Sequence, residues 1–270
     1  MDNMLTVRQE KIFNQLIKIY LDTGDAVSSI CLERHMLNSI APSTIRADLN
    51  FMNQLNLIDQ EHVSSGRVPT DQGLRIYVDQ LFDVLRVEKF DNCVEVDFLK
   101  QFSLFCYQKR GFLKWLNFMG KILFGNVFFI LLPSDQEQVC VKENFKLHIG
   151  DFSSLFSLSE LKQNHVIQPL MNFESNRYSL SDFVSGFDKN DFNYRQSHLF
   201  IGEENKLSWL KSLSMMVVPF SFHQGCVGVI GSRRMNYSTF FKIMPLFSKT
   251  VDTFLKSQRH VNLVKECFYG

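Results

Sequence analysis

The sequence predicts an α+β protein of two domains, and three observations support this prediction. Residues 1–86 carry three apolar patterns with helical spacing, followed by a short strand, a turn and a second strand. Residues 87–270 carry short apolar strands flanked by amphipathic helices, an order typical of α+β domains. Val87–Asp97 is charged and shows no clear period, so we expect the domain boundary to lie there.

The first two helices are marked by their caps. Thr6 and Gln9 have the spacing of a capping box, and Gly24 is suited to end the helix that they open. Ser28 or Ser29 is expected to cap a second helix. The apolar face of the first helix is formed by Ile12, Leu16, Ile19 and Tyr20.

The third predicted helix begins at Pro42, and Ser43 or Thr44 is expected to satisfy its open N–H groups. The apolar face of this helix is formed by Ile45, Leu49, Met52 and Leu55. The residues off that face, near the N-terminal end, are Ser43, Thr44, Arg46, Ala47 and Asn50. Short polar groups and one arginine in this place are typical of a helix that reads base edges in the major groove. The alternative is an ordinary amphipathic helix whose polar face meets solvent.

A hairpin is predicted after this helix. Leu57–Val63 has the composition of a strand, and Ser64–Gly66 supplies a turn in which Gly66 is free to take a positive φ. Ser65 and Arg67 then lie beside the third helix, where an arginine reaches phosphate or a narrow minor groove. The alternative is a solvated arginine on a loop. Three helices and a two-stranded wing together predict a winged helix-turn-helix.

The charge distribution limits how such a domain can bind DNA. The whole chain has a formal charge of +1, so it is not an electrostatic DNA binder as a whole. Residues 1–85 hold seven Lys and Arg against eleven Asp and Glu, a formal charge of −4, whereas DNA-binding domains usually have a basic footprint. We therefore expect a local positive patch on an acidic domain, with modest affinity per subunit. Its expected members are Arg34, His35, Arg46, His62 and Arg67.

The second domain contains several short apolar runs. Val127–Leu132 is continuous and predicts a buried strand, and further strands are predicted at His198–Ile201, Ser214–Phe220 and Cys226–Ile230. A last amphipathic helix is expected to pack on the sheet. The residues that would face the sheet are Phe240, Met244, Phe247, Val251, Phe254 and Leu255.

The middle of the chain is less regular. Leu99–Leu123 has the pattern of one or two helices, and the alternation at Val139 and Val141 predicts a strand. Residues 144–195 are rich in Asn, Ser and Phe and show only short helical hints, at Ser157–Leu161 and Ser181–Val184.

No set of residues predicts a catalytic centre. Glu203 and Glu204 are adjacent, so their side chains point apart and cannot flank one bond. Gly225, Gly228 and Gly231 match neither phosphate-loop consensus, and strand and turn spacing explains them. We therefore expect no enzymatic activity and no cofactor.

The cysteines and histidines indicate neither disulfides nor a metal site. The six cysteines form no CxxC pair and are typical of reduced thiols in a cytoplasmic protein. The seven histidines show no ligand spacing, and His223 and Cys226 have no identifiable acid to orient them as a nucleophile pair. The longest apolar run is too short to span a bilayer, so we expect no membrane association.

Several motifs occur in an order that resembles the HrcA family, the bacterial heat-inducible transcription repressors. In residues 5–79 they are LTVRQ, YLDTGDAVSS, APSTIRADL, LNLI and SSGRVPTDQGLRIYVD. In residues 199–255 they are IGEEN, VGVIG and RMNYS. The resemblance covers these two parts of the chain well and the middle poorly.

The resemblance implies a fold. It indicates an N-terminal winged helix-turn-helix over residues 1–86 and a GAF-like α+β domain over residues 87–270. Family members carry a dimerising insertion in the second domain. This chain is shorter between about 90 and 198, so the insertion, around 144–195, looks reduced and the mode of dimerisation is open. The chain also reads GSRRM at 231–235, where the family has Gly-Pro-Thr-Arg-Met.

The resemblance also implies a function. It indicates a cytoplasmic homodimer that represses heat-shock (chaperone) operons by binding double-stranded DNA at an inverted-repeat operator. A GroE-type chaperonin would keep the repressor folded, and heat stress would release it. The expected DNA contacts are Ser43, Thr44, Arg46, Asn50, Ser65 and Arg67.

Two alternatives stay open at this point. The first is a winged-helix regulator that responds to a small molecule bound by its GAF-like domain. The second is a decayed repressor that dimerises poorly.

Overall fold

A computed structural model of this 270-residue chain shows a mixed α+β protein. The chain divides into two compact units, one holding Met1–Glu88 and the other holding Lys89–Met235 and Thr239–Gly270. The residues that the structure describes are 4–37, 39–60, 66–87, 125–133, 145–152, 155, 172–185, 197–221 and 225–258.

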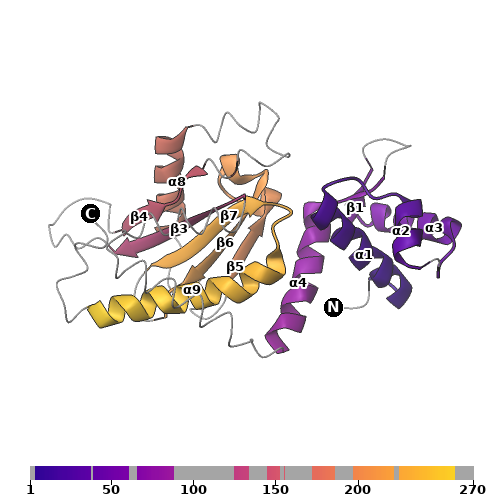
Figure 1. Ribbon diagram of the computed structural model, residues 1–270. Helices are drawn as coiled ribbons and strands as arrows, with labels where there is room; N and C mark the ends of the chain where they lie inside the picture. Colours follow the sequence, from indigo (N-terminus) through magenta and orange to yellow (C-terminus); the bar gives the residue numbers. More distant parts are fainter. Residues whose placement is uncertain are drawn as a thin grey trace. The chain divides into compact units, whose positions relative to one another are not determined.

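The first unit begins with three helices, α1 (Val7–Thr23), α2 (Ser29–His35) and α3 (Pro42–Gln54), shown in Figure 1. The predicted caps are confirmed: Thr6 and Gln9 form a capping box at the start of α1, and Gly24 ends it with a φ of 79°. Ser28 caps α2, and its side chain accepts a hydrogen bond from the backbone N–H of Cys31. The buried apolar residues of the three helices are Ile12, Phe13, Leu16, Ile17, Ile19, Tyr20, Leu32, Ile45, Leu49 and Met52.

A short antiparallel strand pair follows α3. β1 (Ile58–Asp59) pairs with β2 (Val68–Pro69), and α4 (Asp71–Val87) comes directly after it. The predicted strand Leu57–Val63 is therefore present only as β1 within the described residues, since residues 61–65 are not among them. Val27 forms an isolated antiparallel bridge with Arg67, which adds a third segment beside β2.

Gly66 is required for a reason that differs from the predicted one. The turn predicted at Ser64–Gly66 lies outside the described residues except for Gly66 itself. A Cβ atom at Gly66 would instead overlap the backbone carbonyl of Ala26, because the Val27–Arg67 bridge draws the two backbones together. Glycine is used here for close approach of two chain segments.

The second unit is built on a five-stranded antiparallel sheet in the order β4-β3-β7-β6-β5. The strands are β3 (Asn126–Pro133), β4 (Phe145–Ile149), β5 (His198–Ile201), β6 (Leu213–Pro219) and β7 (Cys226–Ser232). The four strands predicted at 127–132, 198–201, 214–220 and 226–230 are confirmed. β4 was not predicted, and it lies within the segment that showed only helical hints.

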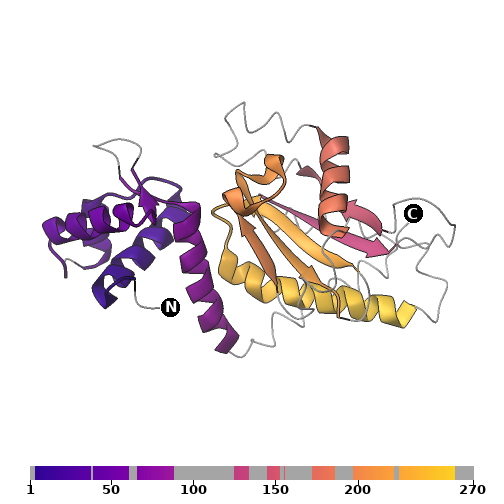
Figure 2. The same ribbon diagram turned by 180° about the vertical axis from the view of Figure 1, so that it is seen from behind.

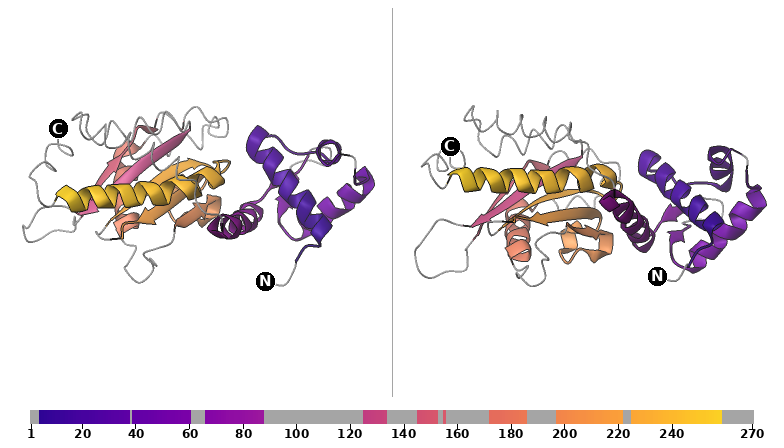
Figure 3. Two further views of the ribbon diagram at one scale, coloured as in Figure 1. Left: turned by 60° about the horizontal axis from the view of Figure 1, so that its bottom comes forward. Right: turned by 90° about the horizontal axis from the view of Figure 1, so that it is seen from below.

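Helices cover the two faces of this sheet, and alternate residues of β3 show which helix covers which face. The ring of Phe128 contacts Phe240 and Phe247 of α9 (Tyr237–Gln258), each with ring centroids 6.2 Å apart. Phe129 points the other way, into a core that includes Leu180 of α8 (Phe173–Ser185). The view from behind shows α8 against β3 and β4 (Figure 2), and Figure 3 shows α9 running along the opposite face.

Some predicted elements lie outside the described residues. These are the helices expected in Leu99–Leu123, the strand expected at Val139 and Val141, and the helical hint at Ser157–Leu161. The hint at Ser181–Val184 falls within α8.

The glycines of β7 and the turn before it have strand-packing roles. Gly225 has a φ of 113° and precedes the strand. Gly228 lies opposite Phe129 in the ladder, and a Cβ atom there would overlap the Phe129 ring. A Cβ atom at Gly231 would overlap the side-chain oxygen of Asn126. β7 extends two residues beyond the predicted strand, through Gly231 and Ser232.

The IGEEN motif ends β5 and stabilises the chain that follows. The Glu204 carboxylate accepts a 2.8 Å hydrogen bond from the backbone N–H of Ile201. The Glu203 carboxylate forms an ion pair of 2.7 Å with Lys211. The buried amide nitrogen of Asn205 lies 3.0, 3.1 and 3.0 Å from the carbonyl oxygens of Gly202, Leu210 and Leu213. These polar residues therefore have structural roles.

Three further properties of the described residues concern metal binding, the Cys226 thiol and membrane-spanning helices. Within them, no three His, Cys, Asp or Glu side chains gather closely enough to hold a metal ion. Burial raises the pKa of the Cys226 thiol, so this side chain behaves as a small apolar group. None of the helices described in this chain combines the length and the apolarity needed to cross a bilayer.

We expect Gly228→Ala to lower the free energy of unfolding of the second unit by about 1–3 kcal/mol, because the new methyl group overpacks the Phe129 ring. Chemical denaturation followed by tryptophan fluorescence measures this effect, since both tryptophans, Trp115 and Trp209, lie in the second unit. Adding Phe129→Leu to Gly228→Ala should recover part of the loss. Full stability of Gly228→Ala alone would contradict the proposed contact.

Candidate nucleic-acid interface

The exposed side of α3 carries polar residues together with Ala47 and Phe51, and it lies opposite the buried face of the helix. Ile45, Leu49 and Met52 are buried in the core of the first unit, as predicted. On the other side, Ser43, Arg46, Ala47 and Asn50 are exposed, while Thr44 is half-buried. Ser43, Arg46 and Asn50 are spaced three and four residues apart, so they follow one side of the helix. The structure thus places three of the predicted contact residues in one row.

The side chains of this row are not used to cap the helix. The N-cap of α3 is Ala41, whose side chain makes no cap hydrogen bond, and Pro42 occupies the first turn. The expectation that Ser43 or Thr44 satisfies the open N–H groups is wrong, because both residues already lie inside the helix. Within the described residues the N-cap side chain leaves the first turn of α3 uncapped, and N–H groups in the first turn of a helix attract anions such as phosphate.

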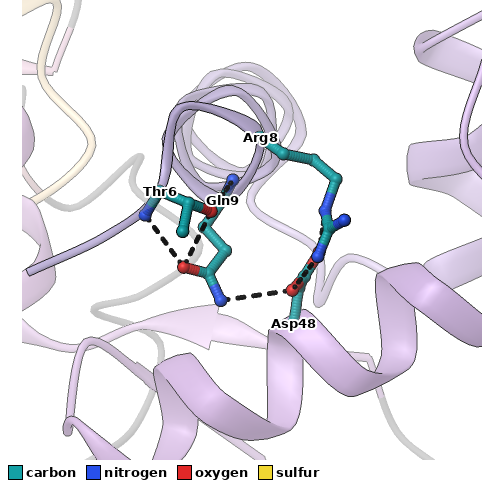
Figure 4. A network of polar contacts seen from close by, with 4 residues as sticks. All are labelled: Thr6, Arg8, Gln9 and Asp48. Carbon is teal, nitrogen blue, oxygen red and sulfur yellow. Dashed lines mark hydrogen bonds and ion pairs between the residues drawn. The ribbon is translucent and has the colours of Figure 1, made fainter.

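A buried carboxylate on α3 connects this helix to the start of α1 (Figure 4). Asp48 is 4% exposed and accepts two hydrogen bonds from Arg8, from Nε at 2.9 Å and Nη2 at 3.1 Å. Its Oδ1 atom also accepts a 3.2 Å bond from the side-chain amide of Gln9, the residue that completes the capping box with Thr6. The bond and charge of Asp48 raise the pKa of Arg8. This network fixes α3 against the first turn of α1.

The network changes the charge that α3 presents to solvent. Arg46 and Asp48 are the two charged residues of α3, and Asp48 is buried and paired. The exposed surface of the helix consequently carries one positive charge and no negative charge. The formal charge of −4 over residues 1–85 therefore does not describe the face on which the predicted contacts lie.

Arg67 lies beside this face, although it belongs to another segment of the chain and directly precedes β2. Its backbone N–H and carbonyl bond to those of Val27, both at 2.8 Å. Its side-chain Nη2 donates a 3.1 Å hydrogen bond to the Oδ1 atom of Asn50. Burial lowers the pKa of Arg67, an effect opposed by the negative charge of Asp59. The structure therefore joins two predicted contact residues that are 17 positions apart.

Some expected members of the site have no described position or no described role. Ser65 and His62 lie outside the described residues. Arg34 and His35 are exposed on α2, and His35 Nδ1 lies 2.9 Å from the carbonyl oxygen of Cys31. The role of Asp48 was not predicted, although the sequence carries a signal for it: an acidic residue falls within the apolar spacing of Ile45, Leu49 and Met52.

Comparison with known proteins supports the resemblance in two ways. Residues 125–240 match the family model described as the HrcA protein C terminal domain. The heat-inducible transcription repressor HrcA of Staphylococcus carnosus is 42% identical over 81 residues, which are 30% of this chain and 25% of that protein. The protein of the same name from Thermomicrobium roseum is 39% identical over 83 residues, 31% of this chain and 24% of that protein. The resemblance to the HrcA family is thereby confirmed, over stretches that span about a quarter of the length of these relatives.

A solved structure shares the fold. The crystal structure of a hypothetical protein has a TM-score of 0.67 to this chain, at 15% sequence identity, and covers 92% of this chain and 99% of its own. At this identity the likeness concerns the fold alone.

We expect Asp48→Ala to lower the free energy of opening of α1 and α3 by about 1–3 kcal/mol, because the buried carboxylate accepts three hydrogen bonds from charged and polar donors. Hydrogen exchange followed by mass spectrometry measures this in peptides from the two helices. Asp25→Ala, at an exposed position of the same unit, is the matched control and should leave protection unchanged. Equal protection in the two variants would show that the network does not hold α3.

Proposed function

We propose that this chain is a negative regulator of transcription that represses heat-shock (chaperone) operons. The observation that carries the proposal is its similarity to proteins named heat-inducible transcription repressor HrcA, about 40% identical over about 80 residues. The match of residues 125–240 to the C-terminal domain of the same family supports it independently. Neither the described residues nor these relatives give positive support for an enzyme.

In this proposal the first unit is a winged helix-turn-helix that binds double-stranded DNA. The α3 helix enters the major groove with Ser43, Thr44, Arg46 and Asn50 as its DNA-contacting residues, and Arg46 reaches base edges. Ser65 and Arg67 contact the backbone or minor groove from the wing. The exposed face of α3, free of negative charge, supports this orientation, because phosphates surround the groove.

The second unit serves as a GAF-like regulatory and dimerisation domain in this proposal. Two copies would bind the two halves of an inverted-repeat operator, because a palindromic site mirrors the two-fold symmetry of a homodimer. A GroE-type chaperonin would keep the repressor folded in the cytoplasm, and heat stress would release repression. These partners follow from the proposed kinship with the family.

The small-molecule alternative is not favoured. The described sheet is packed on both faces by buried side chains, such as Phe128 towards α9 and Phe129 towards α8. The relatives named above are heat-inducible repressors, and their name contains no ligand.

Binding of the intact chain to a duplex that carries the chaperone-operon inverted repeat tests the function. A second duplex with one half-site scrambled is titrated beside it at several salt concentrations. We expect tight binding to the intact repeat and a large loss when one half-site is scrambled. Equal, weak and strongly salt-dependent binding to both duplexes would contradict the proposal, because only nonspecific phosphate contact would be left.

We expect Arg46→Ala to weaken binding to the inverted repeat by about 1–3 kcal/mol and to relax sequence preference at one position of each half-site, because Arg46 is the exposed positive charge of α3. Competition binding with single-base operator variants measures both effects. Lys18→Ala removes the same charge from an exposed position of α1 and serves as the control. A loss that is equal on all sequences would make Arg46 a phosphate contact.

A further inference from the structure

The backbone of Arg67 is held by hydrogen bonds within the first unit. Its backbone is bonded to Val27 on both sides of the bridge, and β2, which pairs with β1, begins at the next residue. Gly66 before it lies against the backbone of Ala26, where no side chain fits. The side chain of Arg67 therefore leaves a ladder of three short segments, not a loose hairpin tip.

The side chain of Arg67 lies against the protein surface. Its Nε atom is buried and has no hydrogen-bond partner among the described residues, while its Nη2 atom reaches Asn50 at 3.1 Å. A guanidinium held in this way keeps its charge beside α3, because an arginine stays protonated even when burial lowers its pKa.

The hydrogen bond from Arg67 engages the Oδ1 atom of Asn50, which is one of the two polar groups of this side chain. Asparagine reads adenine through both groups, with Oδ1 accepting from N6 and Nδ2 donating to N7. Oδ1 of Asn50 already accepts from Arg67, so a two-point contact with adenine would require this bond to break. Among the proposed DNA contacts, Asn50 is therefore suited to a role other than a two-point contact with adenine.

We infer that Asn50 is a positioning residue, which holds the Arg67 guanidinium against the DNA-facing side of α3 so that the helix and the strand after the wing act as one contact unit. This inference rests on the proposed function, since the contact unit is useful only on DNA. Under this inference, Arg46 recognises a base on this side of α3. Arg67, positioned by Asn50, contacts a DNA phosphate.

A double-mutant cycle on the intact chain tests the inference, with the inverted-repeat duplex as the probe. The variants are Asn50→Ala, Arg67→Ala and the double variant. We expect each single change to lower affinity about tenfold and the double change to lower it by about the same factor, because both remove one contact. Additive losses, about a hundredfold for the double variant, would overturn the inference.

The salt dependence of binding separates positioning from base reading. Arg67→Ala should make the slope of log affinity against log salt shallower by about one, and Asn50→Ala should cause most of the same change although it removes no charge. Asn53→Ala, another exposed asparagine of α3, is the control and should leave the slope unchanged. If Asn50→Ala keeps the slope but alters preference at one base pair, Asn50 reads that base itself and the inference is wrong.

A readout without DNA distinguishes failure of this inference from failure of the proposed function. Selective ¹⁵N labelling of arginine side chains reports how freely the Arg67 guanidinium rotates. We expect Asn50→Ala to free it, so that its signals come to resemble those of exposed Arg46. Unchanged Arg67 signals would overturn the inference. If the unaltered chain binds the operator and the scrambled duplex equally, the proposed function is overturned. The role of Asn50 and Arg67 in DNA binding is then overturned as well.

Discussion

The buried carboxylate of Asp48 is the constraint on which the first unit depends. A charged group that leaves water must be paired, and removing one partner of such a pair is more costly than never having formed it. Asp48 is paired with Arg8 and also bonded to Gln9, which itself belongs to the capping box of α1. The start of α1 and the orientation of α3 thus share Gln9, and a rotation of α3 would break the bonds of Asp48 to Arg8 and Gln9.

This arrangement determines what α3 exposes. With Asp48 turned inward, the exposed row of Ser43, Arg46 and Asn50 carries a single positive charge. Arg67, from a distant part of the chain, lies beside this row. Its backbone is bonded to that of Val27, and its side chain donates a hydrogen bond to Asn50. A domain with a net negative charge can therefore have a local surface without negative charge. Salt screens charges that lie more than a Debye length of ~10 Å away, so a phosphate interacts mainly with the charges close to it. The total charge of the domain is a poor guide to that surface.

The second unit shows how far local patterns predict a sheet. Val127–Leu132 was recognisable as a strand because it is uninterrupted and apolar, and β3 is indeed the strand whose two faces contact α9 and α8. β4 was missed because Phe145–Ile149 is short and mixes apolar residues with Lys146 and His148. Its strand conformation comes from pairing with β3, a long-range contact without a local signature.

The sequence by itself determined the first three helices of the first unit, the caps at Thr6, Ser28 and Gly24, and the buried faces, because capping and periodicity depend on residues only a few positions apart. It also indicated a resemblance to the HrcA family, through several motifs that occur in the same order. Tertiary structure decided the pairing of Asp48 with Arg8, the bond between Asn50 and Arg67, and the close approach that requires Gly66. The two side-chain pairs join residues that are 40 and 17 positions apart in the sequence, and Gly66 brings two distant backbone segments into contact. Contacts at such separations follow from the packing of whole helices and strands.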